Sequence, residues 1–133
     1  MKLGFIVLFS VIASFTSSLF SQSYLDKDYL KAINHIWSIS YNANMFNDSD
    51  SEERKEEKLL LIRNSISKAK VYYNNLEEKY PEDKDVKELG IWVEGSEFLY
   101  KGLYNKKRKE DPQWVMMKYL LSISLGDYVK EKL

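Results

Sequence analysis

Two glutamates about one helical turn apart are the residues of this chain best suited to chemistry. Glu94 and Glu97 lie in a stretch whose apolar residues recur at helical spacing. Glu97 would fall about 40° from Val93 around a helix and so border its apolar face. A carboxylate there, beside aromatic rings, could bind a polar or cationic group, and paired acids can also do acid–base chemistry. The candidate partner- or ligand-binding residues are therefore Trp92, Glu97, Tyr100 and Tyr104.

The same glutamates also fit a structural role. Glu97 precedes Lys101 by four residues, the spacing at which opposite charges pair on a helix surface, and Glu94 would then be solvated. Neither arrangement resembles a nucleophile elbow or another catalytic motif. We therefore expect no enzymatic activity and no cofactor.

The other candidates for catalysis or metal binding favour structural roles. The chain has no cysteine, and its one histidine, His35, is expected on the solvated side of a helix. The acidic loop beginning at Asp48 alternates oxygen ligands as Ca²⁺ requires, but Glu53 stands where a calcium loop needs glycine. These acids are better explained as helix capping, so we expect no metal site.

Charge argues against a general nucleic-acid binder. The chain has 20 basic and 20 acidic side chains, without the positive excess that phosphate binding requires. The dense basic run, residues 106–109, is expected at a helix C-terminus, where the helix dipole favours positive charge. An anionic partner such as lipid headgroups or a wall polymer is the alternative.

Four helices are predicted to carry these residues, because no stretch alternates for long enough to be a strand. They are expected over about 25–45, 52–80, 84–107 and from 112 onward. Ser49 with Glu52 predicts a capping box for the second helix, Asp83 a cap for the third, and Asp111 a cap for the fourth. The predicted fold is all-α, an elongated antiparallel bundle.

Apolar spacing predicts which faces are buried. In the second helix the seam steps by three and four residues without a slip, so it could pack within the chain or serve a homodimer. It comprises Leu59, Ile62, Ile66, Ala69, Tyr73, Leu76 and Tyr80. The first helix is expected to bury Tyr29, Leu30, Ile33, Trp37 and Tyr41. Most other large aromatic residues, Tyr119 among them, are also expected in the core.

Glycines interrupt the third and fourth predicted helices. Gly90, Gly95 and Gly102 each cost about 1 kcal/mol relative to alanine inside a helix. The third helix is therefore expected either to kink or to approach a neighbour closely at these positions. Gly126 is expected to end the fourth helix or to mark a bend.

The N-terminus is typical of an export signal. Lys2 precedes an apolar run over residues 3–15, and Ser21 and Ser23 supply the small residues that a signal peptidase requires. Cleavage is predicted after Ser23, with an uncleaved anchor as the alternative. The remaining 110 residues would form a single helical domain, periplasmic or secreted and without stable membrane insertion.

One segment of about forty residues resembles the tetratricopeptide repeat family. Ala69 is followed four residues later by Tyr73, Pro81 would close a helical hairpin, and a Leu89-Gly90 pair lies early in the next helix. The resemblance implies stacked helical hairpins that bind a protein or peptide in a groove, without catalysis.

These features predict an interaction or adaptor module of the bacterial cell envelope. It would bind a protein or peptide partner in an aromatic groove of the third and fourth helices. The alternative is a small-molecule binder with a pocket near Trp92, Glu97 and Tyr100. An open groove or large apolar patch would favour the first, and a closed cavity the second.

Overall fold

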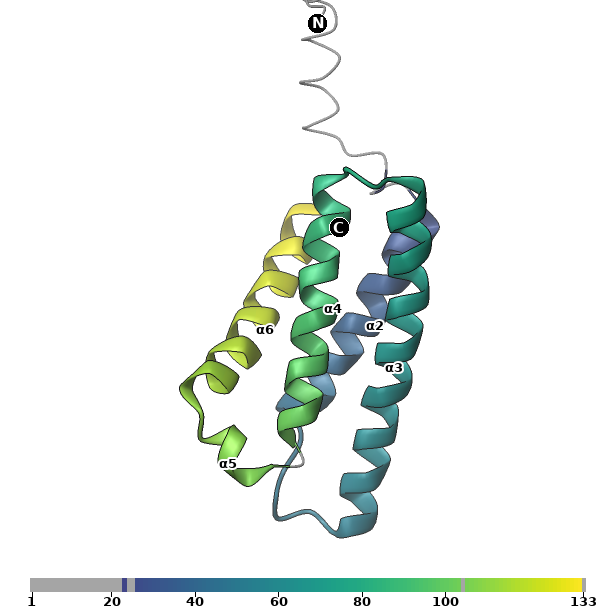
Figure 1. Ribbon diagram of the computed structural model, residues 1–133. Coiled ribbons are helices and arrows are strands. Elements are labelled where there is room, and N and C mark those ends of the chain that lie inside the picture. The colour runs from purple at the N-terminus through teal and green to yellow at the C-terminus, as the bar shows by residue number, and fades with distance from the viewer. Residues whose placement is uncertain (1–22, 24–25, 104, 133) are drawn as a thin grey trace, which may run out of the picture.

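The described part of the chain forms four long helices and one short helix in the computed structural model (Figure 1). The structure describes residue 23, residues 26–103 and residues 105–132, and these contain no strand. The helices are α2 (Lys27–Asn44), α3 (Glu52–Lys79), α4 (Lys84–Leu103), α5 (Lys106–Lys109) and α6 (Pro112–Lys132). The prediction of an all-α fold is confirmed. The predicted signal peptide lies, apart from Ser23, outside the described residues.

Neighbouring long helices run antiparallel, so the bundle is elongated (Figure 1). α3 has 28 residues and is about 42 Å long at 1.5 Å per residue. α2 and α4 both contact α3 on one side and α6 on the other. α3 and α6 therefore form opposite edges of the bundle, at the right and left of Figure 1.

Local capping explains where the helices begin. The Asp83 side chain accepts from the backbone N–H of Asp85 at 2.8 Å, and that of Asp111 from Gln113 at 2.8 Å, as predicted. The predicted cap of α3 is wrong by two residues. Ser51 is the cap, and its hydroxyl accepts from the N–H of Arg54 at 3.2 Å.

Two shorter segments also differ from the predictions. Ser49 is held in a turn, because its N–H and its hydroxyl both donate to the Asn47 side chain. The basic run is not the end of the third helix. α4 stops at Leu103, and the run forms α5, whose first N–H groups donate to the side chain of Asn105 at 3.0 and 3.3 Å.

The glycines of α4 mark close approach to neighbours. A Cβ at Gly90 would lie 2.8 Å from the Tyr73 hydroxyl oxygen, and one at Gly95 would lie 2.9 Å from the sulfur of a methionine in α6. A Cβ at Gly102 would overlap the indole of Trp114. α4 remains one continuous helix through all three positions, so close approach rather than a kink explains these glycines.

The core lies along the inner stripes of the four long helices. The α3 seam is confirmed at Leu59, Ile62, Ile66, Ala69 and Leu76, which are buried within the chain, whereas Tyr73 and Tyr80 are half-buried against the core. The predicted face of α2 is wrong in part, because Leu30, Trp37 and Tyr41 are exposed. The buried stripe of α2 includes small residues, which allow the neighbouring helices to approach closely. Its members are Tyr29, Ala32, Ile33, Ile36, Ile39, Ser40 and Ala43.

Ser23 connects the start of the described chain to the bundle. It is fully buried, and its hydroxyl donates to the Asp83 carboxylate at 2.9 Å. Its carbonyl also accepts from the N–H of Asp26 at 3.0 Å. Cleavage after Ser23 would remove both bonds, whereas Asp83 would keep its bonds to the start of α4.

Candidate functional site

Three of the four predicted binding residues lie in the described part of the chain, and they differ in burial. Trp92 is buried in the core, and its carbonyl accepts a hydrogen bond from the Ser96 hydroxyl at 2.8 Å. Tyr100 is half-buried and packs against the core. Tyr104 lies outside the described residues. Glu97 lies beside two surface clefts.

Glu97 pairs with a different lysine from the one expected. Its carboxylate lies 2.7 Å from the Lys70 ammonium of α3, a contact between two helices that the predicted pairing with Lys101 missed. Clefts of about 470 and 560 Å³ border it, the first between α3 and α4 and the second between α4 and α6. Both are surface clefts, and Glu94 also lines both.

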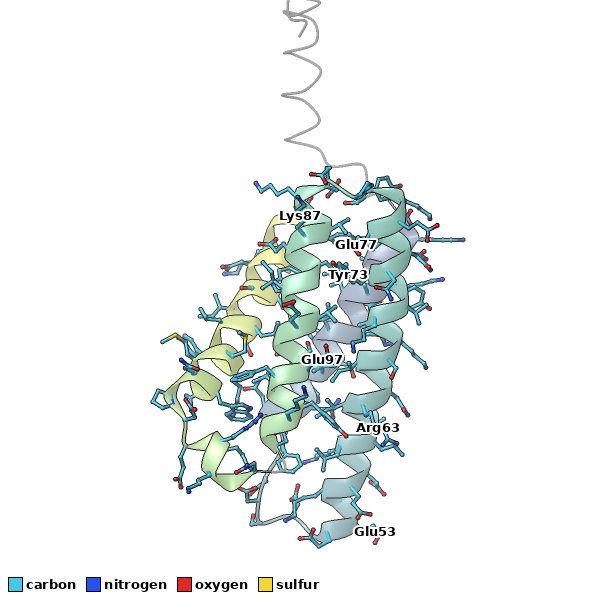
Figure 2. All side chains as sticks on the ribbon, in the orientation of Figure 1. Glu53, Arg63, Tyr73, Glu77, Lys87 and Glu97 are labelled. Carbon is cyan, nitrogen blue, oxygen red and sulfur yellow. The ribbon has the colours of Figure 1, made fainter. Side chains whose placement is uncertain are left out.

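Tyr73 and Glu97 both line the cleft between α3 and α4 and are labelled in Figure 2. The Tyr73 hydroxyl donates to the Glu77 carboxylate at 2.7 Å, and this bond, together with burial, raises the pKa of Tyr73. Glu97 has its own partner in Lys70. Because these two groups already have partners within the chain, their attraction for a charged ligand is weakened.

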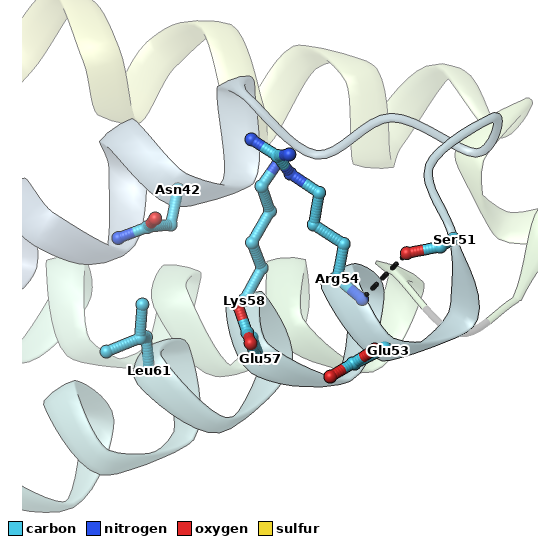
Figure 3. A pocket seen from close by; sticks show the side chains of 7 residues that line it. All are labelled: Asn42, Ser51, Glu53, Arg54, Glu57, Lys58 and Leu61. Atoms are coloured by element: carbon cyan, nitrogen blue, oxygen red, sulfur yellow. Dashed lines mark hydrogen bonds between the residues drawn. The ribbon is translucent and has the colours of Figure 1, made fainter.

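A third cleft, of about 430 Å³, lies where the end of α2 meets the start of α3 (Figure 3). Its walls include Asn42 and Leu61, and its rim carries Glu53, Arg54 and Glu57. Charges of both signs alternate there, as on an ordinary solvated helix start. We assign this cleft a structural role.

A large apolar surface lies instead on α2 and α6. It comprises eight side chains that are 42 to 67% exposed, and we call it the α2–α6 face. Monomeric proteins rarely expose apolar patches above a few hundred Å² without a function. The members are Leu30, Trp37, Tyr41, Val115, Met116, Tyr119, Leu120 and Ile123.

The contact between the two helices places their exposed residues side by side. The hydroxyls of Ser40 and Ser122 are hydrogen-bonded at 3.1 Å, and the Asn44 amide donates to Ser122 at 3.0 Å. At 100° per residue, Tyr41 lies one step outward from this contact line on α2, and Tyr119 lies outward on α6. The exposed stripes of α2 and α6 therefore form one continuous surface.

A cleft of about 670 Å³ ends this face near the start of α6. Phe46, Trp114 and Tyr119 are among its walls. The Lys118 ammonium stands 5.7 Å from the centre of the Trp114 ring, and the Lys109 ammonium stands 4.9 Å from that of Phe46. These cations cover aromatic rings that would otherwise face water.

Charge is scarce around the α2–α6 face. From Pro112 to Gly126, α6 carries Lys118 as its only charged residue, although it has apolar side chains on both its inner and outer sides. A helix that is apolar all round is usually buried on all sides. This continuous apolar run was the sequence signal for the face, but it could not show which side faces outward.

His35 is less exposed than predicted. Its ring stacks on that of Tyr72, with centroids 5.8 Å apart and planes 7° from parallel. Burial, and secondarily the positive charge of Lys68, lower the pKa of His35. Lys31 stands 5.5 Å from the centre of the Tyr72 ring, so His35 belongs to a packed contact between α2 and α3.

Comparison of the chain with protein families, curated proteins and solved structures gave no match. The tetratricopeptide resemblance and the function implied by it therefore stay predictions. No group of three or more metal-ligating side chains occurs within the described parts of the chain. None of the described helices is long and apolar enough to cross a membrane.

Proposed function

We propose that this chain is an exported helical interaction module of the bacterial cell envelope, which binds a helix of a protein partner. The proposal keeps the predicted class of function and moves the binding surface from the third and fourth helices to the α2–α6 face. A single observation carries it. Eight large apolar side chains on two adjacent helices are exposed, with one charged residue between Pro112 and Gly126.

The chemistry of the face favours a helix as its occupant. Two antiparallel helices with apolar outer stripes form a shallow groove, in which the apolar stripe of a third helix can pack. Tyr41 and Tyr119 present large rings with polar tips, a residue type that contributes much of the energy at interfaces. The lack of acidic residues from Tyr29 to Met45 and from Pro112 to Gly126 gives no electrostatic preference for a basic partner.

The alternative, a small-molecule binder near Trp92, Glu97 and Tyr100, has weaker support. Trp92 is part of the core, and the Glu97 carboxylate is paired with Lys70. A small-molecule site buries most of its ligand in a concave pocket, whereas the space beside Glu97 consists of surface clefts.

Site-specific photo-crosslinking in the producing cell tests the proposal. A photoreactive residue in place of Val115 should give a defined protein adduct, because Val115 is 51% exposed and lies on the side of α6 next to α2. The same residue in place of Val71 is the matched control, since Val71 is equally apolar and exposed but lies on α3. Adducts from both positions, or from neither, would contradict the proposal.

A further inference from the structure

The helical glycines of this chain fall into two kinds. Gly90, Gly95 and Gly102 each leave room for a side chain from a neighbouring helix. Gly126 does not, because a Cβ at that position would meet nothing within 4 Å. Glycine in the interior of α6 weakens the helix relative to alanine, and no contact with the described residues explains it.

Gly126 lies on the exposed apolar stripe of α6. It follows Tyr119 by seven residues, which is two helical turns and about 10.5 Å along the axis. The two positions differ by only about 20° around the helix, so they point in nearly the same direction. Ile123 lies between them and is exposed, and Tyr119 is the most exposed side chain of the α2–α6 face at 67%.

We propose that the helix bound by the α2–α6 face is α6 of a second copy of this chain, and that Tyr119 of each copy packs over Gly126 of the other. An antiparallel pair with its twofold axis beside Ser122 and Ile123 brings these positions together twice. The surface is thus self-complementary, as a twofold dimer requires. This inference rests on the proposed function and identifies the partner at the same face.

The size and charge of the face suit a dimer. A fully exposed large side chain offers about 200 Å², so the eight half-exposed ones offer at most about 800 Å² per copy, which is comparable to what each partner buries in a standard stable interface. Lys118 points toward the cleft beside Trp114 rather than along the stripe of Tyr119 and Ile123. Two copies therefore meet without placing like charges opposite each other at the centre.

The seam of α3, the other surface suggested for a homodimer, is not available for this purpose. Ile62, Ala69 and Leu76 are fully buried within one chain. A dimer through α3 would require the bundle to open, whereas a dimer through α6 uses side chains that are already exposed.

Analytical ultracentrifugation of the purified protein over a wide concentration range tests the inference. Wild-type protein should dimerise, and Tyr119→Ala should weaken the dimer by about tenfold or more. Gly126→Ala should also weaken it by about tenfold, because the new methyl group meets the ring of the second copy. In the double variant the added methyl meets no ring, so dimerisation should be no weaker than in Tyr119→Ala alone.

Two controls separate this contact from general damage. Ile91→Ala removes an exposed apolar side chain from α4 and should change the dissociation constant less than about twofold. Gly126→Ala should keep or raise the melting temperature of dilute, monomeric protein, since alanine favours the helix. A variant that merely disturbed folding would lower that temperature.

The outcomes also separate this inference from the proposed function. A chain that stays monomeric at all concentrations, or a dimer insensitive to both substitutions, overturns the inference. If a photoreactive residue at position 115 then still crosslinks to a different protein in the cell, the proposed function stands. An adduct of twice the mass of the chain, lost in Gly126→Ala, supports both.

Discussion

The two edge helices of the bundle, α3 and α6, differ in how well their outward surfaces suit contact with water. Charged residues make up 13 of the 28 residues of α3, which exposes three large apolar side chains, Leu60, Leu61 and Val71. α6 has one charged residue from Pro112 to Gly126 and exposes five large apolar side chains. Both helices pack against α2 and α4, but these neighbours cover α3 more extensively than they cover α6. The outer surface of α3 is therefore mostly charged, whereas that of α6 is mostly apolar and uncovered.

Truncating one side chain on each edge helix should show the largest difference. Ile62 of α3 is fully buried, so Ile62→Ala should lower the free energy of unfolding by about 2 to 5 kcal/mol. Leu120→Ala on α6 should change it by less than about 0.5 kcal/mol, provided the protein is dilute enough to be monomeric. Urea denaturation measures both. Similar losses for the two variants would mean that α6 is as well packed as α3.

The glycines sharpen the comparison within α4 and α6. In Gly102→Ala the added methyl would overlap the Trp114 indole, whose N–H donates to the Leu99 carbonyl at 3.1 Å. We expect this overpacking to cost about 1 to 3 kcal/mol and to change the near-ultraviolet signal of Trp114. Gly126→Ala, the same chemical change, should stabilise the monomer by up to about 1 kcal/mol. If both substitutions stabilised the protein, or both destabilised it, the distinction between glycines that contact a neighbouring helix and Gly126, which does not, would be contradicted.

Periodicity and capping allowed most of the fold to be predicted. The prediction of the α3 seam was correct at most positions because its apolar residues recur without a slip. The predicted caps Asp83 and Asp111 were correct because capping depends on nearby residues alone. The predicted buried face of α2 was wrong in part because that prediction relied on large apolar side chains. In the structure α2 packs closely against three helices, and small residues such as Ala32, Ser40 and Ala43 are buried there. Local spacing can identify a helix more readily than it can identify which side the neighbours cover.

The candidate site was less predictable, since it depends on contacts between distant segments. Glu97 pairs with Lys70, which lies 27 residues away, and nothing in the local spacing indicates that pair. Trp37 and Tyr41 were expected in the core because aromatic rings are usually buried, yet they lie on the α2–α6 face. α6 is apolar all round, so only its docking on α2 and α4 shows which residues remain exposed.

The smallest expected effect on stability comes from replacing one acidic side chain on each side of the bundle. Asp26 caps α2 by accepting from the N–H of Asp28 at 2.9 Å, and it also contacts Lys79 at 3.0 Å and Tyr80 at 3.2 Å near the end of α3. These bonds, the backbone one first, hold the pKa of Asp26 below its ordinary value. Asp127, exposed on α6, is the matched control.

Replacing each acid by asparagine tests whether the charge stabilises the fold. Because the folded chain binds the Asp26 proton less readily than the unfolded chain does, the carboxylate contributes its full stability above about pH 4, the ordinary value for aspartate. That contribution is lost as pH falls through the lowered pKa of the folded state. Asparagine still caps a helix, so Asp26→Asn should cost less than about 1 kcal/mol at neutral pH and flatten the acid limb of the stability profile. Asp127→Asn should leave that limb unchanged, and an equal effect of both variants would mean that overall charge, rather than the contact between α2 and α3, governs acid stability.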